Sequence, residues 1–173
     1  MVTVTETVDD IVSRSGGSAV EAAVREQVLH LLNEACTRLD EQRYRDWIEL
    51  FAPDGRYVAI SAENFENSWP LAVIDDNRAS MLDRAEFIER YWSIEPGRTR
   101  RMVGNVDIEA VGPQQLEVRS AFVVYLTNSD GRVEIQVTGT YRDELVYLDG
   151  WRFRRRTAVH DNDLLTRPVT FPF

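Results

Sequence analysis

The sequence predicts an α+β fold in which a strongly curved, mainly antiparallel sheet wraps around helices from the first half of the chain. Apolar residues recur at helical spacing between residues 18 and 39, which is typical of a helix with one buried face. Apolar and polar residues then alternate in two later runs, 116–126 and 133–147, as in half-buried strands. Because helices come first and strands last, the pattern differs from that of an alternating α/β chain.

The helical half follows residues 1–17, a polar segment without clear periodicity that we expect to be a flexible arm. Ser18 and Glu21 fit a capping box, and the apolar stripe predicts a helix from there to about Leu39. Cys36 lies next to that stripe, where we expect a small buried residue rather than a reactive thiol.

A second, shorter helix is expected from Tyr44 to Phe51, where aromatic and apolar residues again recur at helical spacing. The turn signal Pro53-Asp54-Gly55 would end it. A strand is then expected at 56–61, followed by a weak strand signal at 71–74 and a loop at 75–77. Next we expect a helix that is capped by Ser80 and ended by Pro96-Gly97, and a strand at 100–110.

The last third of the chain predicts most of the sheet. Turn signals at 128–131 and 149–150 separate three strand-like runs, so consecutive strands should pair as antiparallel hairpins. Gly139 interrupts the second run and predicts a bulge or a close backbone approach. The tail, 161–173, is apolar enough that we expect it to dock on its own core or on a neighbour. In the first run, one face carries Leu116, Val118, Phe122, Val124 and Leu126, and the other carries Glu117, Arg119 and Tyr125.

Composition limits the classes of function. A chain of 173 residues with 43% hydrophobic content can bury one core, so we expect a single domain over 18–173. A net charge of −9 argues against nucleic acid or an anionic membrane surface as a general partner. No window reaches the roughly 20 apolar residues of a membrane span. The start of the chain lacks the features of a signal peptide. With one cysteine as well, a cytoplasmic setting is the simplest expectation.

Four segments together resemble one protein family: LDEQRYRDWIELFAPDGRYV at 39–58, RTRRMVGNV at 98–106, the alternation at 116–125, and GTYRDELVYLDGWRFRRRTAVHD at 139–161. In this order they are similar to the beta (small) subunit of bacterial aromatic ring-hydroxylating dioxygenases. The resemblance implies the cone-shaped fold shared with nuclear transport factor 2 and ketosteroid isomerase. It also implies a structural, non-catalytic role beside a large alpha subunit, with three of each chain in an alpha3beta3 assembly.

The family resemblance further implies that the Rieske 2Fe-2S cluster and the mononuclear iron belong to the alpha subunit. The reaction implied is NAD(P)H-dependent dihydroxylation of an aromatic substrate. A count of possible ligands agrees, because a Rieske centre requires two cysteines and two histidines, and an oxygenase iron requires further histidines. This chain has one cysteine and two histidines, so we expect no catalytic, cofactor or metal site in it.

A rival hypothesis is a free-standing lyase or isomerase of the same fold that acts on a small cyclic substrate. Its catalytic group would be His160, at the end of the last strand, or a buried aspartate. The alternative for His160 is a hydrogen-bonded or interface residue, and His30 is expected to lie on a charged, solvated helix face. The candidate aspartates, for which local turn hydrogen bonds are the alternative, are Asp54, Asp75 and Asp76.

The arginine-rich last strand is the candidate docking surface for partner subunits. Arginine is enriched at interfaces and forms paired hydrogen bonds with carboxylates, although a solvated or internally paired strand face is the alternative. The sheet is expected to pack against copies of itself around a threefold axis. The interface candidates are Arg98, Arg100, Arg101, Val123, Tyr125, Arg152, Arg154, Arg155 and Arg156.

Overall fold

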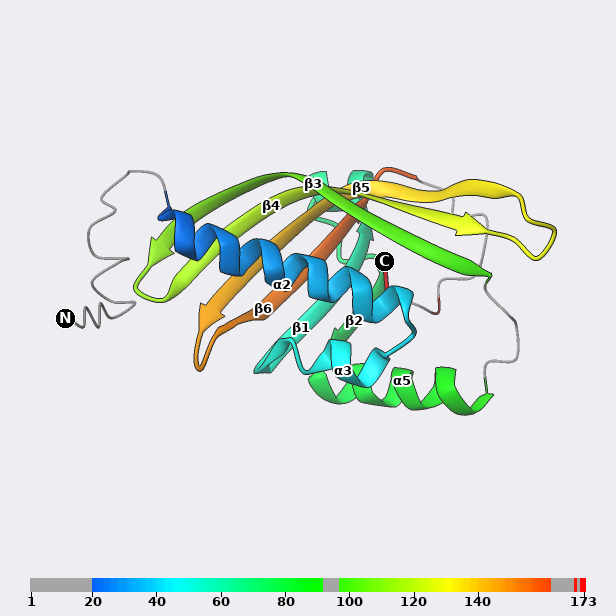
Figure 1. Cartoon of the computed structure of the whole chain (residues 1–173), viewed down its shortest axis with the longest axis horizontal. Coiled ribbons are helices and arrows are strands. Elements are labelled where there is room, and N and C mark those ends of the chain that lie inside the picture. Colours follow the sequence, from blue (N-terminus) through cyan, green and yellow to red (C-terminus); the bar gives the residue numbers. More distant parts are fainter. Residues whose placement is uncertain (1–19, 92–96, 163–169, 171) are drawn as a thin grey trace, which may run out of the picture.

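The computed structural model describes residues 20–91, 97–162, 170, 172 and 173. The strands are β1 (Phe51–Ser61), β2 (Ala72–Asn77), β3 (Arg98–Gly112), β4 (Gln115–Thr127), β5 (Val133–Tyr147) and β6 (Trp151–His160). They form one open, curved sheet in the order β2-β1-β6-β5-β4-β3 (Figure 1). Neighbouring strands are antiparallel except β1 and β6, which are parallel. The predicted α+β fold and the hairpins of β4, β5 and β6 are confirmed.

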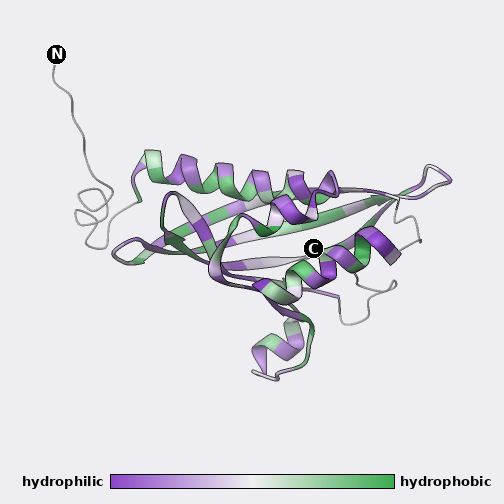
Figure 2. Ribbon diagram, turned by 90° about the horizontal axis from the view of Figure 1, so that it is seen from below, coloured by the Kyte–Doolittle hydropathy of each residue, from purple (hydrophilic) through white to green (hydrophobic). Residues whose placement is uncertain are grey.

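Three of the four helices that the structure describes lie on the inner side of this sheet. The helices are α2 (Ala22–Asp40), α3 (Tyr44–Ile48), α4 (Ala62–Glu66) and α5 (Arg78–Tyr91). The long helix α2 crosses the hollow of the sheet and packs on β3 and β6, while α5 packs on β1 and β2 (Figure 1). Green and purple residues alternate around α2, as expected of a helix with one buried face (Figure 2). The short helix α4 lies on the opposite, outer face, where Ala62 packs against Val58 and Ile60.

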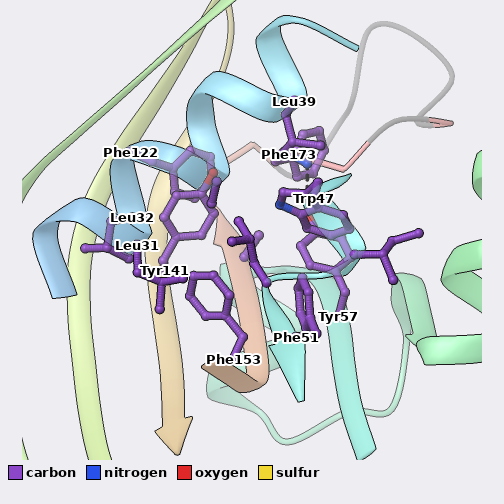
Figure 3. Packing of buried hydrophobic residues seen from close by; sticks show 14 of the residues in the cluster. Leu31, Leu32, Leu39, Trp47, Phe51, Tyr57, Phe122, Tyr141, Phe153 and Phe173 are labelled. Atoms are coloured by element: carbon purple, nitrogen blue, oxygen red, sulfur yellow. Dashed lines mark hydrogen bonds between the residues drawn. The ribbon is translucent and has the colours of Figure 1, made fainter. Parts of the chain in front are cut away.

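The core lies between α2, α3 and the inner face, and aromatic side chains fill much of it (Figure 3). Trp47 contacts Phe51 and Tyr57 edge to face, with ring centroids 4.8 and 5.3 Å apart. Phe122 stacks on Tyr141 at 4.2 Å. Edge-to-face and stacked pairs of this kind contribute about 0.5–1.5 kcal/mol beyond their burial.

Gly139 confirms the predicted close backbone approach. A Cβ atom at this position would overlap the carbonyl oxygen of Val159 and lie 2.8 Å from the Phe122 ring. The absence of a side chain therefore lets β5 approach β6 while Phe122 fills the core.

Two sequence predictions around β1 are wrong. Pro53-Asp54-Gly55 does not end a helix; it lies inside β1, which already begins at Phe51. The pairing of β1 with β6 shifts register between Phe51 and Arg56, and such an irregularity accommodates a proline that cannot donate a ladder hydrogen bond.

The predicted loop at 75–77 is also wrong, because all three residues belong to β2. They pair with Arg56, Tyr57 and Val58 of β1, and these partners compensate for the low strand propensity of Asp and Asn. Helix α5 accordingly starts earlier than predicted. The side chain of Asn77, rather than that of Ser80, acts as the cap and accepts the Ser80 N–H at 3.0 Å.

The ends of the chain give a mixed result. Helix α2 begins at Ala22, so the predicted start at Ser18 is wrong; Ser18 itself and the arm at 1–17 lie outside the described residues. Phe173 is 3% exposed and belongs to the main core cluster, which confirms docking of the tail at this residue. The apolar tail residues Leu164, Leu165, Val169 and Phe171 lie outside the described residues.

Candidate functional site

The outer face of the sheet carries an apolar patch near one end, where β3, β4 and the first residues of β5 lie together. Residues directly opposite each other on antiparallel strands share a face. Tyr125 lies opposite Arg100 on one side and Ile135 on the other, and the neighbouring pairs are in register with it. We call this surface the outer patch; it consists of Met102, Val123, Tyr125, Val133 and Ile135.

Three members of the outer patch are strongly exposed. Met102, Val133 and Ile135 have 61%, 64% and 61% of their surface accessible, although all three are apolar. Val123 and Tyr125 lie between them and are partly buried. A group of exposed apolar residues in one place is typical of an interaction site, whereas single exposed apolar residues are ordinary.

Arg98 and Arg100 border the outer patch on β3. Arg98 lies opposite Thr127, which in turn lies opposite Val133, so this arginine points to the same face. Within the part of the chain that the structure describes, neither guanidinium forms an ion pair, and both residues are exposed. Four of the predicted interface candidates, Arg98, Arg100, Val123 and Tyr125, therefore lie together on one surface.

The arginine-rich strand β6 does not join this surface, because β5 and β4 separate it from β3. Arg152 donates to the Glu49 carbonyl oxygen at 2.5 Å and pairs with Asp149. Arg154 lies 3.7 Å from an Asp54 oxygen, and Arg155 lies 3.4 Å from a Glu144 oxygen. The three side chains are partly exposed and each has a carboxylate neighbour, which agrees with an internally paired strand face.

Arg101 and Arg156 are buried, with side chains only 4% and 2% exposed. Arg101 pairs with Asp40 at 2.6 Å, and the same carboxylate accepts the Arg101 backbone N–H at 2.9 Å. Their surroundings in the folded chain leave no surface for a partner to contact, so they support the core rather than a docking face.

Arg156 and Asp143 form a buried ion pair inside the cone. This pair was not predicted from the sequence. Their closest atoms, Arg156 Nη1 and Asp143 Oδ2, lie 3.8 Å apart, and the guanidinium lies 3.7 Å from the centroid of the Tyr141 ring. Among the described residues neither Asp143 oxygen accepts a hydrogen bond. Burial raises the pKa of Asp143 to about 7, and the Arg156 charge opposes that rise. The alternation Gly139, Tyr141, Asp143, Leu145 places this aspartate on the inner face and could have revealed it.

His160 is buried, as the rival hypothesis requires, but its contacts are structural. Its Nδ1 lies 2.8 Å from the Asn162 carbonyl oxygen, and its ring lies edge-on to Phe173 at 5.6 Å. Asp161 is exposed and accepts a hydrogen bond from the Thr138 hydroxyl at 2.9 Å. Neighbouring strand residues therefore face opposite sides, as the sequence predicts, and the two do not form a catalytic pair.

The three candidate aspartates lie beside arginines. Asp75 accepts two hydrogen bonds of 2.6 Å from Arg56, which hold its pKa below the usual value. Asp76 is paired with Arg84 at 2.5 Å, and Asp54 is exposed beside Arg154. Asp75 is therefore a poor general base, because its ion pair with Arg56 stabilises the charged form.

Other predicted features lie where the sequence suggests. Cys36 is buried, and burial raises its pKa. His30 is exposed and lines an open groove of about 780 Å³ between α2 and the β5–β6 turn, together with Trp151 and Glu34.

A metal site is not evident in the described ranges 20–91, 97–162, 170, 172 and 173, where no three His, Cys, Asp or Glu side chains gather closely enough to hold an ion. None of the helices within those ranges is long and apolar enough to cross a membrane.

Comparison with known proteins identifies relatives with this architecture. The small subunit of anthranilate 1,2-dioxygenase from Burkholderia cepacia is 26% identical over 149 residues, which cover 83% of this chain and 92% of the relative. A solved chain assigned as the beta subunit of an aromatic-ring-hydroxylating dioxygenase from Novosphingobium aromaticivorans superposes with a TM-score of 0.79 at 26% identity, covering 88% of this chain and all of that one. A chain of naphthalene 1,2-dioxygenase shares the fold, with a TM-score of 0.74 at 18% identity, covering 91% of this chain and 89% of that one.

The family model described as "Ring hydroxylating beta subunit" matches residues 34–167, which include α3, α4, α5, all six strands and the last seven residues of α2. This chain belongs to the family of ring-hydroxylating dioxygenase beta subunits.

Proposed function

We propose that this chain acts in the cytoplasm as a structural beta subunit that holds iron-bearing alpha subunits in a symmetric alpha3beta3 assembly. In this role it contributes no group to the chemistry. The Rieske cluster and the mononuclear iron belong to the alpha subunit, which oxidises the aromatic substrate with electrons that originate from NAD(P)H. The chain's own contribution is the geometry in which the alpha subunits are held.

The outer patch is the observation that carries the proposal. Interface cores are rich in Met, Tyr and Arg, and the outer patch joins Met102 and Tyr125 to exposed Ile135 beside Arg98 and Arg100. Leaving these residues in water is unfavourable, since burial is worth about 25 cal/mol per Å² of apolar surface. Three copies of the chain bury this surface against one another around a threefold axis.

Co-expression with the alpha subunit, followed by sizing with light scattering, tests the assembly. The wild-type chain is expected to elute with the alpha subunit in a complex of six chains. Ile135→Glu places a charge in the outer patch and should yield smaller species, because burying an unpaired carboxylate costs several kcal/mol. The circular dichroism of the isolated variant should remain that of the wild-type chain, since Ile135 is exposed.

Val111→Glu is the matched control. Val111 lies on the same strand as Met102 and is 48% exposed, but it lies at the other end of β3, outside the outer patch. The control should assemble like the wild-type chain. A complete six-chain complex formed by Ile135→Glu would contradict the proposal, as would turnover of an arene or a cyclic substrate by the purified chain alone.

A further inference from the structure

Phe173, in the apolar tail, lies inside the core. Its side chain is 3% exposed and belongs to the main apolar cluster, at the end where Leu39 and Trp47 lie (Figure 3). Its ring is edge-on to His160 at 5.6 Å. The enclosure of this ring therefore comes from α2, α3 and β6, which are distant from it in the sequence.

The peptide group that joins Pro172 to Phe173 is held by two buried side chains. The Phe173 N–H donates to the Tyr57 hydroxyl oxygen at 2.8 Å, and Arg101 Nη2 donates to the Pro172 carbonyl oxygen at 2.7 Å. Both polar groups of a single amide are thus satisfied. Burial also raises the pKa of Tyr57 to about 12, so its hydroxyl is neutral at physiological pH.

These two side chains are positioned independently of the tail. Tyr57 is fully buried on β1, where its ring packs edge-on to Trp47 at 5.3 Å. Arg101 on β3 is fixed by Asp40 at the end of α2, through its side chain at 2.6 Å and its backbone N–H at 2.9 Å. The donor, the acceptor and the apolar walls would therefore stay in place if Pro172 and Phe173 were deleted.

The enclosure continues beside Pro172 into a residual cavity of about 10 Å³, lined by Trp47, Tyr57 and Ile88 among others. This volume is close to that needed by one water molecule. Apolar cavities of about 150 Å³ left by truncated core side chains remain dry and bind benzene-sized molecules, so an enclosed space of this kind can accept a free aryl group.

We propose that Pro172 and Phe173 occupy a binding site for an aryl group joined to a secondary amide, and that the site takes a free N-(2-arylethyl)amide when these two residues are deleted. The aryl group enters the space of the Phe173 ring. The amide N–H donates to Tyr57, and the amide carbonyl accepts from Arg101. This site is separate from the outer patch and does not depend on the proposed function.

The test uses the chain with Pro172 and Phe173 deleted and the probe N-phenethylacetamide, which reproduces the amide and the ring of the deleted segment. The variant should melt at a lower temperature than the wild-type chain, and the probe should raise its melting temperature in a concentration-dependent manner. The wild-type chain should show no such shift, because its own Phe173 fills the site. N-ethylacetamide, which lacks the ring, should stabilise neither protein.

Adding Tyr57→Phe to the deletion removes the acceptor for the amide N–H of the probe and should weaken probe binding roughly tenfold, the equivalent of one lost hydrogen bond. If the shortened chain does not fold alone, the probe should restore the circular dichroism of the wild-type chain, and N-ethylacetamide should not. The proposal is overturned if the shortened chain neither binds the probe nor is refolded by it, if the wild-type chain binds it equally well, or if N-ethylacetamide works as well.

Discussion

The Asp143→Asn substitution tests whether the cost of burying the Asp143 carboxylate exceeds its attraction to Arg156. The attraction between Asp143 and Arg156 at 3.8 Å is about 4 kcal/mol at an effective dielectric constant of about 20. Removing a carboxylate from water costs several kcal/mol, and this one accepts no hydrogen bond among the described residues. The two effects are comparable in size. The pKa of Asp143 is raised from 3.8 to about 7, which indicates that the cost of burial is larger than the attraction to Arg156.

The direction of the pKa shift gives the sign of the effect on stability, and its size gives the order of magnitude. The folded state holds the Asp143 proton up to about pH 7, whereas the unfolded chain releases it near pH 3.8. Stability from this group is therefore complete at low pH and is lost as the pH rises through about 7. Three pKa units correspond to a loss on the order of 4 kcal/mol. Asparagine resembles the protonated carboxyl and does not ionise, so the variant avoids this loss.

Chemical denaturation of both proteins across this pH range measures the difference. The variant and the wild-type chain should be equally stable at about pH 4 or below. At about pH 8 the variant should be more stable by on the order of 4 kcal/mol, or roughly 10 °C in melting temperature for a chain of this size.

Asp75→Asn is the matched control with the opposite sign. Asp75 pairs with Arg56 at the surface, and the hydrogen bonds from Arg56 lower its pKa. This variant should lose stability at neutral pH, by less than about 1 kcal/mol because both side chains are largely solvated, and the loss should disappear at low pH. If Asp143→Asn is instead less stable than the wild-type chain at about pH 8, the ionised pair is a net stabilising contact and the reasoning about burial is wrong.

Two further predictions follow from the core. Gly139→Ala should lower the free energy of unfolding by more than about 3 kcal/mol, measured by urea denaturation, because the added Cβ would overlap the Val159 carbonyl oxygen and press on the Phe122 ring; a loss below about 1 kcal/mol would show that the strands move apart easily. Cys36 should react with a thiol reagent only at the rate of global unfolding, because it is buried and its pKa is raised; rapid labelling of the native chain would contradict this.

The sequence predicts the sheet well where one face is buried along a whole strand. In β4 the alternation from Leu116 to Leu126 matches the observed inner and outer faces. The prediction failed where contacts with other segments outweigh the intrinsic strand propensity of a residue. Asp75 and Asp76 have low strand propensity, yet both lie in β2, where their carboxylates bind Arg56 and Arg84.

The buried arginines show a second limit. Arg101 and Arg156 resemble the exposed arginines around them in the sequence, and their burial depends on acids that lie far away along the chain or on another strand. Asp40 ends a helix some sixty residues before Arg101, and Asp143 faces Arg156 only once β5 and β6 have paired in register. Alternation places Asp143 on the inner face, but the local sequence does not identify the partner of either arginine, because each contact is created by tertiary packing.

The outer patch depends on a register shift between β4 and β5 that the alternation of apolar residues does not predict. Val133, Ile135 and Val137 are spaced two apart, so a regular strand would place them on one face. The register of β4 with β5 shifts between Val124 and Tyr125, which lie opposite Val137 and Ile135. Val137 is therefore fully buried, while Ile135 is 61% exposed beside Tyr125. A single extra residue in β5 thus moves two apolar side chains from the core to the surface, where a subunit interface can use them.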